Sequence, residues 1–202
     1  MKTVKNGHKR HIRLDAVLLI IGVVCLSIFA GISYYNAMEE KRSRETVQQL
    51  RSMRDVGIAP RVDSSQTDTE KQDAITTSYE RLFEANADMI GWLNIPGTQI
   101  DYPVMQTPED EEYYLRRNFY KEKDKNGCLL MDTDSDIHMS GANLVIHGHN
   151  MKSGDMFGTL QDYQDQEYGM EHNKLYLYTR DEKREYELIA VFFSKVYLQT
   201  DQ

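Results

Sequence analysis

The chain has 202 residues, a formal net charge of −8 at pH 7 and only two cysteines, Cys25 and Cys128. This length suits one ordinary domain with accessory segments. The negative charge, and the absence of a basic stripe with interleaved aromatic residues beyond the N-terminal arm, argue against a nucleic-acid partner. Because the two cysteines are far apart and Cys25 lies within an apolar run, we expect no disulfide.

The N-terminus combines a basic arm, residues 1–15, with an uncharged apolar run, residues 16–35. A run of this length can span a bilayer as a helix. Because a clear small-residue cleavage site is missing, we interpret the run as an uncleaved signal anchor, with the basic arm in the cytoplasm. The prediction is a single-pass protein of the cell membrane whose folded domain is extracellular. A buried core helix fits the length and the charge asymmetry less well.

Residues 36–70 are predicted to separate this anchor from the folded domain. Residues 36–55 are rich in Glu, Lys, Arg and Gln, which is typical of a solvated helical stalk. Residues 57–70 contain Pro60 and many Ser, Thr and Asp residues, which is typical of a linker. We therefore place the start of the folded domain at residue 71.

The folded domain is predicted to begin with an amphipathic helix and to continue with short strands. In residues 71–86, apolar residues recur at i, i+4, i+7 and i+8, which indicates the helix. Alternating or short apolar runs predict strands at 90–95, 98–106, 127–132, 143–149, 174–179 and 185–198, the last two forming a hairpin. Short helices are expected at 109–117 and after Gly154, where Ser153 or Asp155 is available as a cap.

Residues 143–157 carry the main candidate for an active site. They read Asn-Leu-Val-Ile-His-Gly-His-Asn-Met-Lys-Ser-Gly-Asp-Met-Phe. On a strand, alternation would place His147 and His149 on one face, and Gly148 between them removes a Cβ where another group could approach. A histidine at the end of a strand is a candidate proton carrier, although histidines in such places are more often structural.

Several blocks of this sequence resemble a class B sortase, a membrane-anchored cysteine transpeptidase of Gram-positive bacteria. The first block contains Gly91-Trp92 and Asp101-Tyr102-Pro103-Val104, and the second is Tyr113-Tyr114-Leu115. Residues 127–132 and 143–157 follow in the family's order, and the combination is specific although each block alone is weak. The resemblance implies a mostly β fold, a closed sortase-like β-barrel that is incomplete here, preceded by an amphipathic helix and a single transmembrane helix.

The resemblance also implies a His, Cys and Arg active site in which His149 matches the catalytic histidine. In that mechanism a cysteine thiolate attacks the threonine carbonyl of a C-terminal sorting signal and forms a thioester. The histidine protonates the departing amine, and the arginine binds the developing oxyanion. The implied partners are a surface protein with a sorting signal, the amine of a peptidoglycan precursor, and the membrane.

The sequence departs from the family pattern in its nucleophile. The family's cysteine lies in a Thr-Cys strand beyond the histidine and its arginine one strand further on, and neither segment precedes Gln202. We therefore expect residues 71–202 to be a C-terminally incomplete catalytic domain that cannot perform transpeptidation. Cys128 is no substitute, because a cysteine in apolar surroundings has a raised pKa and little thiolate.

Two further residues are expected to bind substrate. His147 occupies a position where family members commonly carry tyrosine beside the substrate groove, and Leu115 matches a wall of that groove. Simple core packing is an equal alternative for Leu115.

Two other functions stay open at this point. A sortase-like domain without catalysis could bind partners at the envelope. A metal hydrolase could use His147 and His149 with a carboxylate from Asp132, Asp134 or Asp136. Two ligands on one strand do not complete a metal site, and no further metal motif is present, so we predict no metal and no cofactor.

Overall fold

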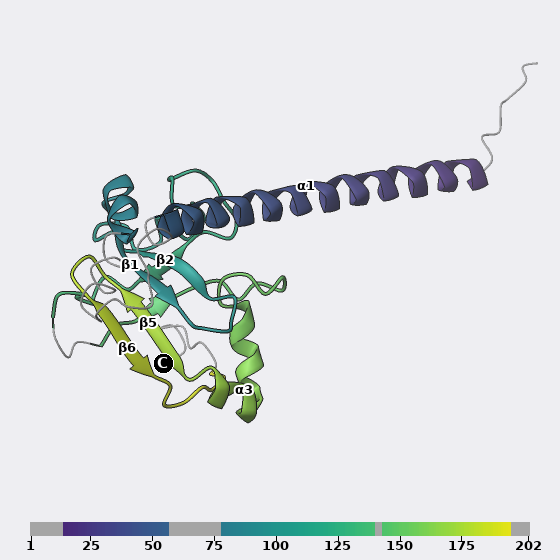
Figure 1. The fold of residues 1–202 in the computed structure, drawn as a ribbon. Helices are drawn as coiled ribbons and strands as arrows, with labels where there is room; N and C mark the ends of the chain where they lie inside the picture. The colour runs from purple at the N-terminus through teal and green to yellow at the C-terminus, as the bar shows by residue number, and fades with distance from the viewer. Residues whose placement is uncertain (1–13, 57–77, 140–142, 195–202) are drawn as a thin grey trace, which may run out of the picture. The chain divides into compact units, whose positions relative to one another are not determined.

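The computed structural model describes residues 14–56, 78–139 and 143–194, and the chain divides into two units, Met1–Lys41 and Arg42–Gln202 (Figure 1). The predicted linker, the predicted domain start at residue 71 and nearly all of the basic arm lie outside the described residues.

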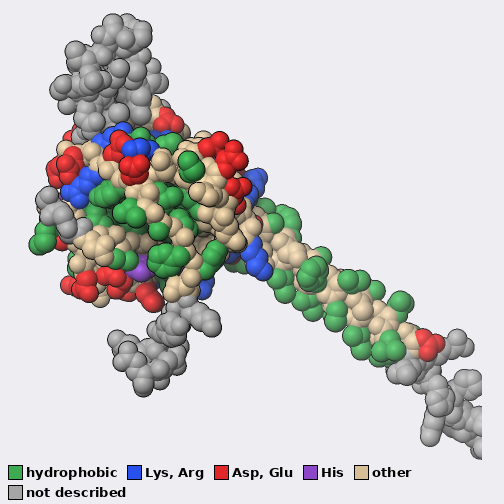
Figure 2. Space-filling view, turned by 90° about the horizontal axis from the view of Figure 1, so that it is seen from below, with side chains coloured by type: hydrophobic (Ala, Val, Ile, Leu, Met, Phe, Trp, Pro, Cys, Tyr) green, Lys and Arg blue, Asp and Glu red, His purple; other side chains and the backbone are tan. Residues whose placement is uncertain are grey.

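The first unit contains the start of helix α1 (Leu14–Val56), and apolar side chains cover this part of the helix (Figure 2). Its most apolar window has a mean hydropathy of 2.7, and none of that window is buried. Among the described residues this is the one helix long and apolar enough to cross a membrane, a test that a signal sequence passes as well. The alternative of a buried core helix is wrong, since Leu19 and Phe29 are both exposed.

In the second unit the last turns of α1 belong to the hydrophobic core. Leu50 is only 1% exposed and lies in one cluster with Phe83 and Trp92. Val47 and Met53, three residues to either side, also pack against the core. The expectation of a solvated stalk is wrong here, because three apolar side chains at helical spacing form a narrow stripe within a mostly charged segment.

Residues 78–85 are helical, with Tyr79, Leu82 and Phe83 buried, so the predicted amphipathic helix is confirmed over this part. A six-stranded sheet follows. Its strands are β1 (Met89–Asn94), β2 (Asp101–Met105), β3 (Leu129–Met131), β4 (Ile146–His147), β5 (Lys174–Tyr178) and β6 (Lys183–Glu187).

The strand order is β4-β3-β2-β1-β5-β6, with β2 and β3 parallel and the other neighbours antiparallel. The sheet is curled like part of a barrel, and within the described residues it stays open, with β4 and β6 at its edges. The mostly β description fits the chain only weakly, because α1 alone has 43 residues whereas each strand has two to six.

The predicted hairpin is confirmed by the register of β5 and β6, in which Tyr178 faces Lys183. Two strand predictions were too long. Strand β6 ends at Glu187, and residues 188–194 have no regular structure. The strand predicted over 143–149 is confirmed only for the two residues of β4, Ile146 and His147, which are half-buried and exposed.

The helix predictions need correction as well. Residues 109–117 form consecutive turns, with an isolated bridge between Arg117 and Lys123. After Gly154 the chain forms a 3-10 helix, η1 (Gly158–Gln164), which has no side-chain cap, and then α3 (Gln166–Glu171). Neither Ser153 nor Asp155 caps a helix; Asp165 caps α3 by accepting from the backbone N–H groups of its first turn.

Candidate active site

His149 follows strand β4, which pairs with the fully buried strand β3 through Leu130 and His147. The approach to His149 is tightly packed. A Cβ on Gly148 would lie 2.5 Å from Leu129 Cδ2 and 2.7 Å from Phe157 Cδ2. Glycine at this position therefore allows the chain to pass between the sheet and the Phe157 ring on its way to the histidine.

The imidazole of His149 is held by the turn region before β3. Its Nε2 lies 3.0 Å from the carbonyl oxygen of Leu115, and the contact is partly buried. Because a carbonyl oxygen only accepts, this contact is a hydrogen bond when Nε2 carries the proton. In that tautomer Nδ1 is the basic nitrogen, which suits a group that accepts and returns a proton.

His147 has a different partner. Its Nε2 lies 3.5 Å from Asp132 Oδ2, beside the end of β3, and its side chain is 52% exposed. Leu115 is half-buried and packs against the core cluster that contains Leu130, while its carbonyl meets His149. The structure thus brings His149 and Leu115 together, whereas the polar contact of the His147 ring is with Asp132.

The carboxylates around His147 also bear on the metal alternative. Ligand atoms of Glu111, Asp132 and His147 lie within 4.8 Å of one another in the described part of the chain. This group does not include His149, so it differs from the pair of histidines on which a metal hydrolase was considered. Exposed acidic groups commonly gather without a metal, and the geometry alone defines no site.

Both cysteines are free, as expected. Cys128 is buried, and its Sγ donates to the carbonyl of Arg117 at 3.5 Å. Burial, with a smaller effect of Asp124, raises the pKa of the Cys128 thiol far above its ordinary value. Cys25 is exposed on the apolar part of α1.

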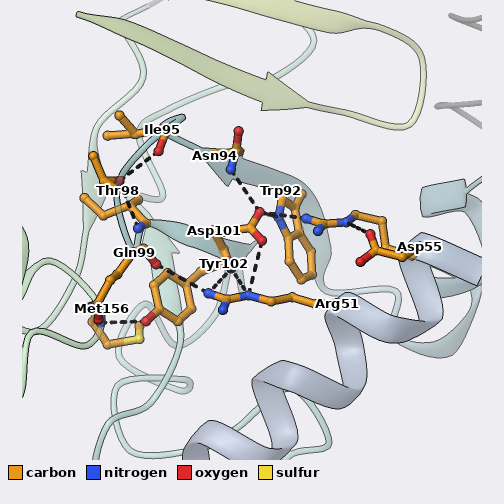
Figure 3. A network of polar contacts seen from close by, with 12 residues as sticks. Arg51, Asp55, Trp92, Asn94, Ile95, Thr98, Gln99, Asp101, Tyr102 and Met156 are labelled. Carbon is orange, nitrogen blue, oxygen red and sulfur yellow. Dashed lines mark hydrogen bonds and ion pairs between the residues drawn. The ribbon is translucent and has the colours of Figure 1, made fainter. Parts of the chain in front are cut away.

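A charged network fixes the end of α1 against β1 and β2 (Figure 3). Asp101 pairs with Arg54 at 2.6 Å and with Arg51 at 3.2 Å, and it also accepts from Trp92 Nε1 at 2.7 Å. Burial acts to lower the pKa of Arg54, but its bonds to Asp101 and Asp55 outweigh this, so the net shift is upward. Arg54 is therefore held in its charged form at the edge of the core.

This network was missed from the sequence. Arg51 and Arg54 are one helical turn apart on what reads as a solvated stalk, and nothing in their spacing points to Asp101.

The sortase domain family matches residues 93–199 of this chain, so the chain belongs to the sortase family. Within that family it is a class B sortase. It is 29% identical to sortase B of Listeria monocytogenes over 175 residues and 24% identical to sortase B of Staphylococcus aureus over 164 residues. The chain spans 67% and 62% of the lengths of these two relatives, and the matches cover 87% and 81% of the chain.

Solved structures give the same result. The crystal structure of sortase B from Bacillus anthracis in complex with AAEK1 is similar with a TM-score of 0.65 and 29% identity, covering 80% of this chain and 72% of the other. The Staphylococcus aureus sortase B-substrate complex has a TM-score of 0.60 at 23% identity, with 74% and 64% covered, and so supports the fold. The curled mixed sheet is therefore similar to the sheet of sortase B structures.

Proposed function

We propose that this chain carries the proton-transferring histidine of a class B sortase-type transpeptidase, which joins a surface protein to peptidoglycan. The observation that carries the proposal is the placement of His149, which follows an edge strand and is oriented by the Leu115 carbonyl at 3.0 Å. Membership of the sortase family supplies the reaction class.

His149 is proposed to donate a proton in the first half of the reaction and to accept one in the second half. A cysteine thiolate attacks the carbonyl carbon of threonine in a sorting signal, and the C–N bond breaks as the departing amine takes a proton from the imidazolium. In the second half the amine of a peptidoglycan precursor attacks the thioester and gives a proton back to the imidazole, and the thiolate leaves. With Nε2 bonded to Leu115, Nδ1 is the nitrogen that exchanges the proton.

His147 and Leu115 are proposed to contact the sorting-signal peptide. His147 is exposed and has a carboxylate beside it, so it can offer either a donor or an acceptor to a peptide backbone. Leu115 is half-buried, which leaves part of its side chain available to an apolar side chain of the substrate.

The apolar part of α1 is proposed to be a single membrane anchor, with the sortase domain outside the cell. Its length and composition support a membrane span, and its side chains are exposed as they would be to lipid. The partners are then the membrane, a surface protein with a sorting signal and a cell-wall amine.

Because Cys128 is buried with a raised pKa, and Cys25 lies on the apolar run, we propose that the nucleophile is supplied by neither. The test is intact-mass analysis of the 202-residue chain in lipid nanodiscs after incubation with sorting-signal peptides. We expect no thioester adduct. An adduct on Cys128 would overturn the assignment of the nucleophile.

A non-catalytic envelope-binding domain is the second candidate, and the buried state of Cys128 is the observation in its favour. Assays of the full-length protein distinguish the two functions. Transpeptidation of a sorting-signal peptide onto an amine supports the enzyme, whereas peptide binding without any thioester would support the binding domain.

A further inference from the structure

The segment between His149 and Gly158 folds back onto the histidine. The backbone N–H of Phe157 donates to the carbonyl of His149 at 3.0 Å, and Asn150 and Met156 form an isolated antiparallel bridge. The backbone of His149 therefore moves with residues 155–157, and whatever holds those residues also orients the imidazole.

Asp155 is the charged group in this segment, and its side chain is only 12% exposed. A carboxylate in such a place is costly unless it is paired and hydrogen-bonded. It has both kinds of partner: Arg44 Nε lies 3.1 Å and 3.0 Å from its two oxygens, and Ser153 Oγ donates to it at 2.7 Å. Arg44 comes from α1, 111 positions earlier in the chain.

Met156, the next residue, has φ = 54°, in the left-handed region that side chains other than glycine seldom adopt. Such a conformation persists where the surroundings impose it. Its backbone N–H donates to the Tyr102 hydroxyl at 3.1 Å. The residue directly before it is Asp155, whose carboxylate is held by Arg44. The Tyr102 bond and the Arg44–Asp155 pair thus both hold the chain where it enters Met156.

We propose that Arg44 is a positioning residue for His149, acting through Asp155 and the Phe157 N–H bond. Arg44 contributes no group to the reaction itself. Its guanidinium holds the carboxylate, the carboxylate holds Met156 in its left-handed conformation, and Phe157 then meets the carbonyl of His149. The role in catalysis rests on the proposed function of His149, whereas the effect on the segment does not.

The same helix offers a matched control two residues away. Arg42 pairs with Glu122 at 2.8 Å, and both side chains are more than half exposed, 66% and 53%. An exposed pair of this kind contributes little to stability. Arg42→Gln removes the same charge from the same helix and leaves the segment around His149 untouched.

The experiment compares Arg44→Gln, Arg44→Lys and Arg42→Gln in the 202-residue chain in lipid nanodiscs. Two readouts are used: amide hydrogen exchange of residues 149–158 by mass spectrometry, and the Cε1–H signal of His149 in a histidine-labelled NMR sample. We expect Arg44→Gln to speed exchange in this segment by about tenfold and to shift the His149 signal. Arg44→Lys should recover much of both, and Arg42→Gln should change neither.

A second variant keeps the test valid if Arg44→Gln leaves too little folded protein. The double variant Arg44→Gln/Asp155→Asn removes both charges, so no unpaired carboxylate is buried, while the link between α1 and the segment is still lost. Faster exchange in the double variant supports the proposal. Exchange equal to that of Arg42→Gln, in Arg44→Gln or in the double variant, overturns it.

Activity of the full-length protein separates this inference from the proposed function. Arg44→Gln should lower kcat with little change in KM, because the substrate contacts stay in place. If Arg44→Gln speeds exchange but His149→Gln keeps full activity, the proposed function is refuted. The effect of Arg44 on residues 149–158 is then still supported. Loss of activity in His149→Gln with normal exchange and kcat in Arg44→Gln would refute the positioning role alone.

Discussion

The Nε2 atom of His149 and the carbonyl oxygen of Leu115 lie 3.0 Å apart, although 34 positions separate the two residues. The Leu115 carbonyl is itself placed by its neighbours, because the N–H of Cys128, at the start of the approach to β3, donates to the Tyr114 carbonyl at 3.0 Å. The orientation of the histidine thus depends on the turns at residues 111–116 and on the chain that passes beside them.

Gly127→Ala is expected to disturb His149 from a distance. Gly127 has φ = 60°, and an added Cβ would overlap the carbonyl oxygens of both Tyr114 and Leu115. Because those are backbone atoms, they cannot yield as a flexible side chain would. We expect a loss of about 1–3 kcal/mol in the free energy of unfolding, and a shifted Cε1–H signal of His149 in NMR spectra.

Gly169→Ala is the control for that variant. Gly169 lies in α3, and its added Cβ would meet Tyr163 at an ordinary distance of 3.6 Å. Alanine in a helix is favourable by up to about 1 kcal/mol relative to glycine, so stability should hold or rise. An unshifted His149 signal in Gly127→Ala would show that the Leu115 carbonyl does not orient the imidazole.

Asp101→Asn is expected to weaken the attachment of α1 to the sheet. The change removes the charge that compensates Arg54 and Arg51. The Arg54 and Asp101 side chains are only 15% and 16% exposed. Breaking one partner of a buried pair costs about 3 kcal/mol. Chemical denaturation measures this loss. Asp55→Asn, which removes a partner that is 61% exposed, should cost under about 1 kcal/mol, and equal losses would contradict the account.

Cys128 should resist alkylation while the chain is folded. In a Cys25→Ser background it is the single thiol, and its burial and raised pKa leave little thiolate at neutral pH. We expect iodoacetamide to modify it more than about 100-fold more slowly in the native protein than in urea. Rapid modification of the native protein would mean that the thiol is accessible and ionised after all.

The stability of the domain should fall in acid partly because of Asp88. Burial acts to raise the pKa of Asp88, but the hydrogen bonds from Tyr114 and Lys121 outweigh it and lower the pKa below its ordinary value. A carboxyl group whose pKa is lowered in the folded state stabilises that state at pH values above the pKa of the unfolded chain. This contribution is lost as the pH falls through the lowered pKa. Thermal melts from pH ~5 to pH ~2 should therefore show a shallower decline for Asp88→Asn than for the native sequence. An unchanged decline would show that Asp88 does not contribute to the loss of stability in acid.

Local patterns predicted the elements that depend on neighbouring residues. The β5–β6 hairpin is confirmed because alternation and a turn signal lie within one short stretch. The amphipathic helix is confirmed over residues 78–85 for the same kind of reason. By contrast, of the strand predicted over 143–149 only β4, Ile146–His147, is formed, and within the described residues it pairs with β3 alone.

The candidate site could be predicted only in part. The sequence singled out His149, but its partner is the backbone carbonyl of Leu115. Every residue has such a carbonyl, so the identity of the side chain does not indicate which one accepts the bond. The Arg44–Asp155 and Arg54–Asp101 pairs join a charged helix to segments far along the chain, and neither composition nor periodicity reveals pairs of this kind. Tertiary packing decided which of the many charged residues of α1 face the domain.

The role of His149 is tested by single-turnover kinetics of the full-length protein, with the native sequence and His149→Gln compared on a sorting-signal peptide. If His149 protonates the departing amine, the variant should form the thioester at least about 100-fold more slowly while binding the peptide as well as before. Thioester formation at the native rate in His149→Gln would show that His149 does not protonate the departing amine.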